Sequence, residues 1–147
     1  MNRTLYLAYG SNLNLEQMSQ RCPAATPVGA TVLKDYRLLF RGGHGGSVAT
    51  VEPLKGKAVP CLLWDITPAD EAALDRYEGW PFLYRKETVK VKHNGKTVSA
   101  MVYIMNEGRP LGQPGCYYYS TILVGYKIAG FDTAVLKQAV EDSVCKD

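Results

Sequence analysis

The fold is decided at one short stretch between two apolar segments, Tyr9-Gly10-Ser11-Asn12-Leu13. Before it, residues 3–9 are rich in Leu and Tyr, which predicts a buried strand. After it, residues 15–19 predict a helix, and either Asn12 or Asn14 can cap that helix. We therefore expect a strand that turns through Gly10 directly into a helix.

This turn has the features of a loop that binds an anion. The first N–H groups of a helix have no partner within the helix, and the helix dipole favours negative charge there. Gly10 lets a ligand approach the backbone closely, and Ser11 and Asn12 add side-chain donors. The stretch is thus a candidate pocket for a carboxylate or a phosphate. The alternative is an ordinary strand-to-helix turn with an Asn cap, which the residues alone favour.

The rest of the chain predicts strands and helices without regular alternation. Further strands are expected over residues 31–40, 47–52, 58–66, 84–92 and 97–105, the last two joined by an Asn94-Gly95 hairpin turn. Further helices are expected from a Thr67 cap to Gly79, over residues 117–128, and from an Asp132 cap to residue 144. This order predicts an α+β fold, a small mixed, strongly curved β-sheet or barrel with flanking helices, formed by residues 1–147 as a single domain.

Glu78 is placed where its charged form is disfavoured. It falls in the last turn of the helix that stops at Gly79, so it faces the negative end of the helix dipole. The apolar stretch that follows, with Trp80 and Phe82, can exclude water from it. Both effects predict a raised pKa, which suits a general base working near neutral pH. The alternative is a solvated Glu at a helix end, and position alone leaves the two interpretations evenly balanced.

Tyrosine is the other polar side chain that recurs in apolar surroundings. Tyr117, Tyr118 and Tyr119 follow one another in a predicted helix, and Tyr84 and Tyr103 lie in predicted strands. Phenols supply hydrogen bonds from an apolar wall. Helical tyrosines nevertheless more often fill a core or cover a surface than bind a ligand.

Cysteines and histidines favour neither thiol nor metal chemistry. The four cysteines show no Cys-x-x-Cys spacing and are expected to be free thiols. The two histidines, His44 in a Gly-rich loop and His93 in a hairpin turn, are too isolated to activate a thiol or to complete a metal site. We therefore expect no metal site and no thiolate nucleophile.

Composition narrows the class of protein further. The formal net charge is +3 over 147 residues and the lysines are scattered, so we expect no nucleic-acid partner. No apolar run approaches the roughly 20 residues that span a bilayer, and the N-terminus lacks a secretory signal. We expect no membrane partner and a cytoplasmic location.

Taken together, these stretches resemble the gamma-glutamylcyclotransferase superfamily, including its gamma-glutamylamine cyclotransferase and avirulence-induced-gene-like branches. The motifs keep the family's order along nearly the whole chain: Tyr9-Gly10-Ser11-Asn12-Leu13, Tyr36-Arg37-Leu38-x-Phe40, Ala49-Thr50-Val51 before Pro53, Leu74-Asp75-Arg76-Tyr77-Glu78-Gly79 with Tyr84-Arg85, and finally Pro114, Tyr118 and Gly125. Each motif is of moderate specificity alone, and the set is specific.

The resemblance implies a small mixed β-barrel with flanking helices and a pocket at the barrel mouth. It implies that Glu78 is the catalytic acid/base. It places seven residues around the substrate: Tyr9, Gly10, Ser11, Asn12, Leu13, Tyr84 and Tyr118. No cofactor and no metal are implied.

The implied activity is cyclotransfer from a gamma-glutamyl amino acid or amine. The alpha-amine of this small-molecule substrate attacks its own gamma-carbonyl and releases 5-oxoproline. Two alternatives stay open: a non-catalytic module of the same fold that binds small carboxylates, and removal of a gamma-glutamyl protecting group in a biosynthetic pathway. The sequence predicts neither the leaving amine nor the oligomeric state.

Overall fold

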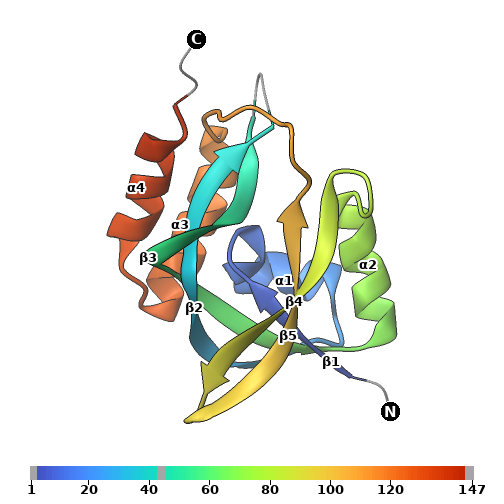
Figure 1. Cartoon of the computed structure of the whole chain (residues 1–147). Coiled ribbons are helices and arrows are strands. Elements are labelled where there is room, and N and C mark those ends of the chain that lie inside the picture. Colours follow the sequence, from blue (N-terminus) through green and yellow to red (C-terminus); the bar gives the residue numbers. More distant parts are fainter. Residues whose placement is uncertain (1–2, 43–45, 145–147) are drawn as a thin grey trace.

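The structure is a computed structural model of the chain, and it describes residues 3–42 and 46–144. The strands are β1 (Thr4–Ala8), β2 (Thr26–Arg41), β3 (Val48–Ile66), β4 (Tyr84–His93) and β5 (Lys96–Met105). The helices are α1 (Leu15–Arg21), α2 (Pro68–Glu78), α3 (Cys116–Ala129) and α4 (Thr133–Asp142), and a short 3-10 turn, η1 (Ser11–Leu13), joins β1 to α1 (Figure 1). His44, in the Gly-rich loop, and Cys145 lie outside the described residues.

The strands form a mixed sheet in the order β2-β3-β1-β5-β4. β1 runs parallel to β5 and antiparallel to β3. The edge strands β2 and β4 approach each other, and the Thr31 hydroxyl donates to the Lys92 carbonyl at 2.5 Å, but they do not pair as a ladder. The α+β class and the mixed, curved sheet are confirmed. The sequence allowed either a strongly curved sheet or a barrel. The sheet is open, so a closed barrel was the wrong expectation.

β3 is one long strand where the sequence predicted two. Strands were expected over residues 47–52 and 58–66, with Pro53 and Gly56 in the gap between them, yet β3 runs from Val48 to Ile66. Pro53 pairs with Tyr36 of β2, and β1 pairs with β3 only from Leu62 onward. A proline is tolerated in a strand where one edge has no ladder partner, because its missing N–H is then not needed.

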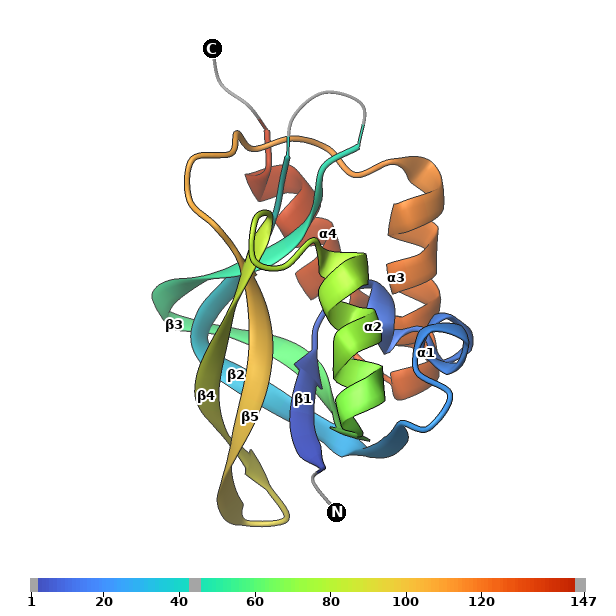
Figure 2. The same ribbon diagram turned by 90° about the vertical axis from the view of Figure 1, so that its right-hand side faces the viewer.

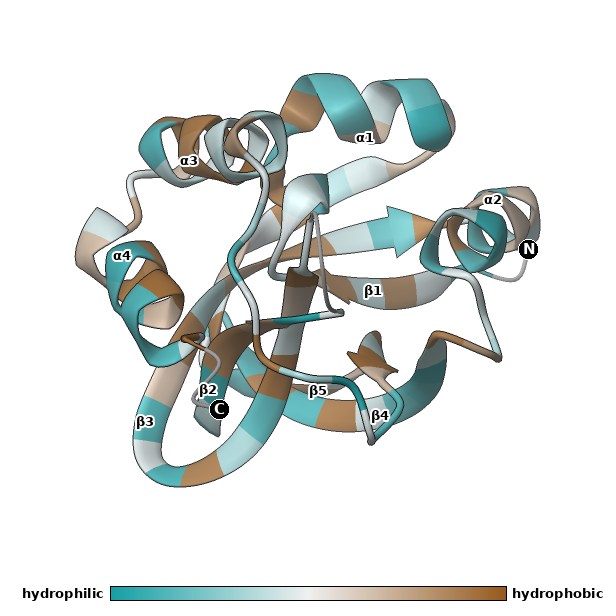
Figure 3. Ribbon diagram, turned by 90° about the horizontal axis from the view of Figure 1, so that it is seen from above, coloured by the Kyte–Doolittle hydropathy of each residue, from teal (hydrophilic) through white to brown (hydrophobic). Residues whose placement is uncertain are grey.

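β2 and β3 form an antiparallel pair, and β2 carries an irregularity where the pair bends. The register between β2 and β3 shifts between Lys34 and Tyr36, and Asp35 between them has a φ of 64°. The Asp35 carboxylate accepts a hydrogen bond from the Gly56 N–H at 3.0 Å. A β-bulge of this kind bends a strand and increases its twist. Seen from above, polar and apolar bands alternate along the curved β3, as expected of a strand with one buried face (Figure 3).

The bounds of α2 follow the capping signals in the sequence. The Thr67 hydroxyl accepts from the Asp70 N–H, and the Asp70 carboxylate accepts from the Thr67 N–H, so the capping box is complete. At the other end Gly79 has a φ of 68°, the left-handed conformation that ends helices. Glu78 is therefore the last residue of α2, as predicted.

The helices that concern the site lie on one side of the sheet. Figures 2 and 3 show α1, α2 and α3 gathered there, with the strands on the other side. α3 packs tightly on η1: a Cβ atom added at Gly125 would lie 2.7 Å from the carbonyl carbon of Leu13. This packing holds α3 against the turn that follows β1.

Candidate active site

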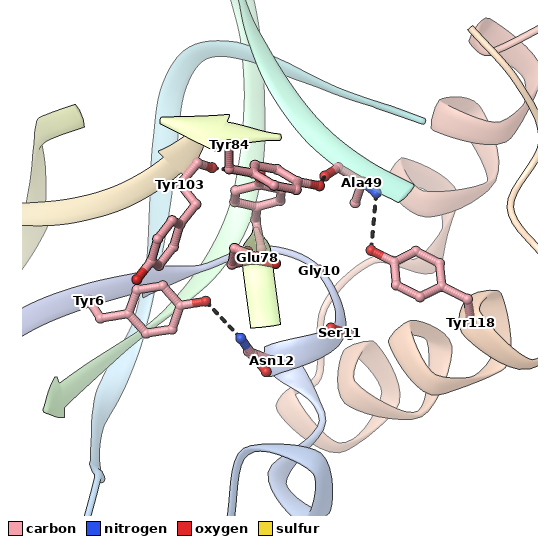
Figure 4. Close-up of a pocket in the computed structure, with 10 residues that line it drawn as sticks. Tyr6, Gly10, Ser11, Asn12, Ala49, Glu78, Tyr84, Tyr103 and Tyr118 are labelled. Atoms are coloured by element: carbon pink, nitrogen blue, oxygen red, sulfur yellow. Dashed lines mark hydrogen bonds between the residues drawn. The ribbon is translucent and has the colours of Figure 1, made fainter. Parts of the chain in front are cut away.

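A cavity opens where the end of β1, the last residue of α2 and the start of α3 meet (Figure 4). It encloses about 300 Å³ of empty space, part of it open to solvent. Its lining consists of ten residues: Tyr6, Tyr9, Gly10, Ser11, Asn12, Ala49, Glu78, Tyr84, Tyr103 and Tyr118. The structure thus brings together all of the residues that the sequence singled out for the substrate and the acid/base, except Leu13.

Leu13 faces the core instead of the cavity. It is fully buried, and its backbone lies against Gly125 of α3. It is the third residue of η1, and its N–H bonds to the Gly10 carbonyl at 3.0 Å. Its place in the signature is explained by packing, so we leave it out of the proposed substrate contacts.

The loop after β1 is a single 3-10 turn, followed by a second helix start. Asn14 caps α1, because its side chain accepts from the Gln17 N–H at 3.1 Å. Asn12 lies inside η1, which settles the choice between the two asparagines. The first N–H groups of such a turn cannot be used by the turn itself, and the residues that carry them, Ser11 and Asn12, line the cavity.

The polar side chains of this loop are held by neighbours. The Asn12 amide donates to the Tyr6 hydroxyl at 2.9 Å (Figure 4), and its carbonyl oxygen accepts from Arg21 at 2.5 Å. The Ser11 hydroxyl shares a hydrogen bond of 2.8 Å with the Tyr77 hydroxyl. Both side chains are buried, so their orientation is set before a ligand binds.

Two tyrosines bind the backbone of the same residue, Ala49, on the opposite wall. The Tyr84 hydroxyl donates to the Ala49 carbonyl, and the Tyr118 hydroxyl accepts from the Ala49 N–H at 3.0 Å. Because Tyr118 accepts here, its own proton is free to be donated into the cavity. Tyr117 is 77 % exposed and does not line the cavity, so one tyrosine of the helical trio takes part in the site.

The sequence did not assign Tyr6 or Ala49 to the pocket, although Ala49 stands in one of the family motifs. Tyr6 packs edge-to-face on Tyr103, whose hydroxyl donates to Asp75 at 2.6 Å. A phenol inside an otherwise aliphatic buried strand needs a polar partner, and that requirement was the available signal for Tyr6. Ala49 offers no such signal, because it contributes its backbone.

Glu78 lies in the middle of these side chains in Figure 4. It stays partly accessible, as a residue at an open cavity does. Burial among the surrounding protein atoms raises its pKa from 4.5 to about 7, and the positive charge of Arg21 opposes this rise. Within the described residues no side chain forms a hydrogen bond with its carboxylate. A carboxylate in this state can accept a proton near neutral pH and release it again.

The source of this burial differs from the sequence prediction. Trp80 and Phe82 were expected to exclude water from Glu78, but Phe82 is 85 % exposed, and the Trp80 ring lies 4.2 Å from the Lys86 ammonium group. The tyrosines of β1, β4, β5 and α3 surround the carboxylate instead. They come from four elements that are distant in the sequence.

The described cysteines lie away from this cavity. Cys22 and Cys61 are buried and Cys116 is exposed, all three are free, and none lines the cavity. Burial raises the pKa of the Cys22 thiol to about 11, which disfavours its thiolate. In residues 3–42 and 46–144 no group of three or more His, Cys, Asp or Glu side chains could hold a metal ion. The helices described there include none long and apolar enough to cross a bilayer.

The chain matches the family described as "Gamma-glutamyl cyclotransferase, AIG2-like" over residues 6–120. The chain belongs to this family. It is 31 % identical over 137 residues to gamma-glutamylcyclotransferase of Homo sapiens, an alignment that covers 86 % of this chain and 71 % of the human protein. Gamma-glutamylcyclotransferase of Mus musculus gives the same identity and coverage.

Solved structures agree with the assignment to the gamma-glutamyl cyclotransferases. A structure of a gamma-glutamyl cyclotransferase superimposes with a TM-score of 0.84 at 26 % identity and covers 99 % of this chain and 90 % of that one. YkqA from Bacillus subtilis shares the fold, with a TM-score of 0.82 at 22 % identity over 99 % of this chain and 57 % of that one. The family is one of enzymes, and the relatives support cyclotransferase activity for this member.

Proposed function

We propose that this gamma-glutamyl cyclotransferase converts a gamma-glutamyl amino acid or amine into 5-oxoproline and the free amino compound, with Glu78 as general base and then general acid. The observation that carries the proposal is the position of Glu78, a carboxylate of raised pKa that faces the loop formed by Gly10, Ser11 and Asn12 across one small cavity. A site that only binds a carboxylate gains nothing from a second carboxylate beside its ligand.

The reaction moves two protons from the alpha-ammonium group of the substrate to its leaving nitrogen. Glu78 takes the first proton, and the freed amine attacks the gamma-carbonyl carbon and closes a five-membered ring. The bond from that carbon to the leaving nitrogen breaks as Glu78 gives its proton to this nitrogen. The ring nitrogen then loses its second proton, which the released amine takes up. Holding the two reacting groups together inside one molecule is an orientation effect that can supply roughly 7–11 kcal/mol in favourable cases.

The remaining lining residues can orient the substrate and stabilise charge. We assign the alpha-carboxylate to the N–H groups of the loop at Gly10, Ser11 and Asn12. The Tyr118 hydroxyl accepts a hydrogen bond from Ala49, so its own proton is free. We assign this proton to the gamma-carbonyl oxygen, where it stabilises the negative charge that develops during the reaction. The Tyr84 hydroxyl is committed to the Ala49 carbonyl, so Tyr84 acts as a wall.

The test of this proposal is the formation of 5-oxoproline. A panel of gamma-glutamyl amino acids, gamma-glutamyl amines and larger gamma-glutamyl conjugates would be incubated with the protein, and 5-oxoproline measured by mass spectrometry. We expect release from at least one class and none from the alpha-glutamyl isomers, which cannot close the same ring. Binding of several panel members without any turnover would favour a carboxylate-binding module instead.

Gly10→Val is expected to lower kcat/KM by about 10²-fold, while Ser11→Ala lowers it by less than about tenfold. The φ of Gly10 is −122°, so the reason is space and not backbone conformation. A Cβ atom at this position would lie 3.3 Å from the Ala49 Cβ and 3.6 Å from the Tyr118 hydroxyl, and the branches of Val would extend into the cavity. Ser11→Ala removes only the contact with Tyr77 and keeps the backbone donor.

Steady-state kinetics of both variants, with circular dichroism to confirm folding, checks this expectation. Equal losses for the two variants would show that the serine hydroxyl matters as much as the backbone. The loop would then hold its ligand by side chains.

The pH dependence of kcat/KM is expected to show an acid limb near pH 7. Glu78 must be ionised to accept the proton, and its pKa is raised from 4.5 to about 7. As the pH falls below 7, the ionised fraction and the rate therefore fall about tenfold per unit. His93 lies at the β-hairpin tip, packed against Gly29 and away from the cavity. The control is the His44→Gln, His93→Gln double variant, and loss of the limb in this variant would assign it to histidine.

A further inference from the structure

Arg21 does not line the cavity, but it connects two segments that do, the loop after β1 and the last turn of α2. Arg21 is the last residue of α1, and its guanidinium donates to the side-chain oxygen Oδ1 of Asn12 at 2.5 Å and to the side-chain oxygen Oε1 of Gln17 at 2.6 Å. The same guanidinium lies over the ring of Tyr77, 3.5 Å from the ring centroid. Arg21 therefore contacts the loop after β1 and the last turn of α2 at once.

Both polar side chains of the loop are linked to this guanidinium. Asn12 is buried, its amide donates to the Tyr6 hydroxyl and its oxygen accepts from Arg21. Ser11 bonds to the hydroxyl of Tyr77, whose ring is the one that Arg21 covers. Without Arg21 the Asn12 oxygen would be left without a partner, and a buried acceptor in that state favours rotation of the whole amide.

The charge of Arg21 is not neutralised by a carboxylate. Among the described residues none of the ion pairs includes Arg21, whereas Arg3, Arg41, Arg85 and Lys86 are each paired. Arginine stays charged at every pH at which the protein is folded. Its field therefore reaches the cavity undiminished by an acidic partner.

The groups around Glu78 leave Arg21 as the source of positive charge. The titratable groups that face Glu78 from the surrounding elements are Tyr6, Tyr9, Tyr77, Tyr84, Tyr103, Tyr118 and Arg21. Burial raises the pKa of the Tyr6, Tyr9 and Tyr84 phenols well above 10, and those of Tyr103 and Tyr118 are raised too, so these groups stay neutral. Behind Tyr103, the Lys86 ammonium group is already bound to Asp75 and Glu71.

We propose that Arg21 is a positioning residue of the cyclotransfer site: its guanidinium ties the substrate loop to the helix that carries Glu78 and holds a positive charge over the residue before Glu78. The inference rests on the proposed function of Glu78. It goes beyond it by assigning a task to a residue outside the cavity. Arg21 touches neither the substrate nor the reacting atoms, and it acts through Asn12, Tyr77 and its charge.

Three variants separate the charge of Arg21 from its geometry. Arg21→Met removes both, Arg21→Lys keeps the charge and loses the planar fork, and Arg76→Met is the matched control. Arg76 is exposed on α2, two residues before Glu78, and among the described residues its side chain forms no hydrogen bond or ion pair. kcat and KM would be measured from pH 5 to 9, and the Glu78 carboxyl would be titrated directly by ¹³C NMR.

Arg21→Met is expected to raise KM about tenfold or more and to move the acid limb of kcat/KM to higher pH by on the order of one unit. The direction follows because loss of a nearby positive charge makes the carboxylate harder to ionise. Arg21→Lys is expected to raise KM but to keep the acid limb of kcat/KM close to that of the unchanged enzyme. Arg76→Met is expected to change neither KM nor the acid limb. An unchanged KM together with an unchanged NMR titration of Glu78 in Arg21→Met would overturn the inference.

The NMR titration makes failure of this inference distinguishable from failure of the proposed function. If the Glu78 resonance in Arg21→Met titrates at higher pH while the rate limb stays, Arg21 acts on Glu78 as proposed and Glu78 is not the base. If Arg21→Met does not fold, Arg21→Lys and Tyr77→Phe carry the test. Tyr77→Phe keeps the ring and loses the contact with Ser11, and an unchanged KM in both variants would overturn the inference.

Discussion

Glu78→Gln is expected to lower kcat/KM by about 10²–10⁴-fold, the loss that accompanies removal of a general base. Gln has nearly the same shape and cannot take a proton, so the cavity walls and the loop at Gly10 stay in place. Binding of 5-oxoproline, measured by calorimetry, should therefore change little. The matched control is Glu107→Gln, an exposed carboxylate away from the cavity, which should keep full activity. Near-normal turnover in Glu78→Gln would remove this residue from the mechanism.

The same variant should be more stable than the unchanged protein above pH 7. The pKa of Glu78 is about 7 in the folded protein and 4.5 without its surroundings, so the folded state holds the extra proton between these values. Stability of the unchanged protein therefore falls as the pH rises through this window, and the loss persists above pH 7. Glu78→Gln has no ionisable group here and avoids that loss, so its free energy of unfolding at pH 8 should be larger by roughly 1–3 kcal/mol. Urea unfolding at pH 5 and pH 8 checks the sign.

Gly125→Ala is expected to destabilise the fold and to remove most of the activity, although Gly125 lines no cavity. The added Cβ would lie 2.7 Å from the carbonyl carbon of Leu13, 2.8 Å from its Cβ and 2.9 Å from its oxygen. Backbone atoms cannot turn away as a side chain can, so α3 and η1 must separate. Overpacking of this kind destabilises by about 1–3 kcal/mol or more. The better helix propensity of Ala offsets only about 1 kcal/mol of that.

The activity should fall because α3 and η1 each contribute to the site. Tyr118 lies in the first turn of α3, and Ser11 and Asn12 lie in η1, so a shift between them widens the cavity. The matched control is Gly115→Ala at the start of α3, where an added Cβ meets nothing within 4 Å. Melting temperature and kcat/KM of the two variants would be compared. Normal values for Gly125→Ala would contradict the close packing of α3 on η1.

Local signals predicted the elements well where a cap or a turn residue set their ends. Thr67 and Asp70 begin α2 and Gly79 ends it, and Asn94 and Gly95 form the hairpin turn with positive φ at both positions. These signals act between residues a few positions apart, so they are present in the sequence itself. The prediction failed at Pro53, because whether a proline fits in a strand depends on which edge of that strand is paired.

The sequence by itself determined that Glu78 ends a helix, that a Gly-Ser-Asn turn follows the first strand, and that both belong to a gamma-glutamyl cyclotransferase signature. Only the tertiary structure decided that the two face each other across one cavity, that Leu13 belongs to the core, and that tyrosines rather than Trp80 and Phe82 bury the carboxylate. The physical reason is range. A cap or a turn is fixed by hydrogen bonds within a few residues, whereas the pKa of Glu78 depends on atoms that β1, β4, β5, α1 and α3 bring together from distant parts of the chain.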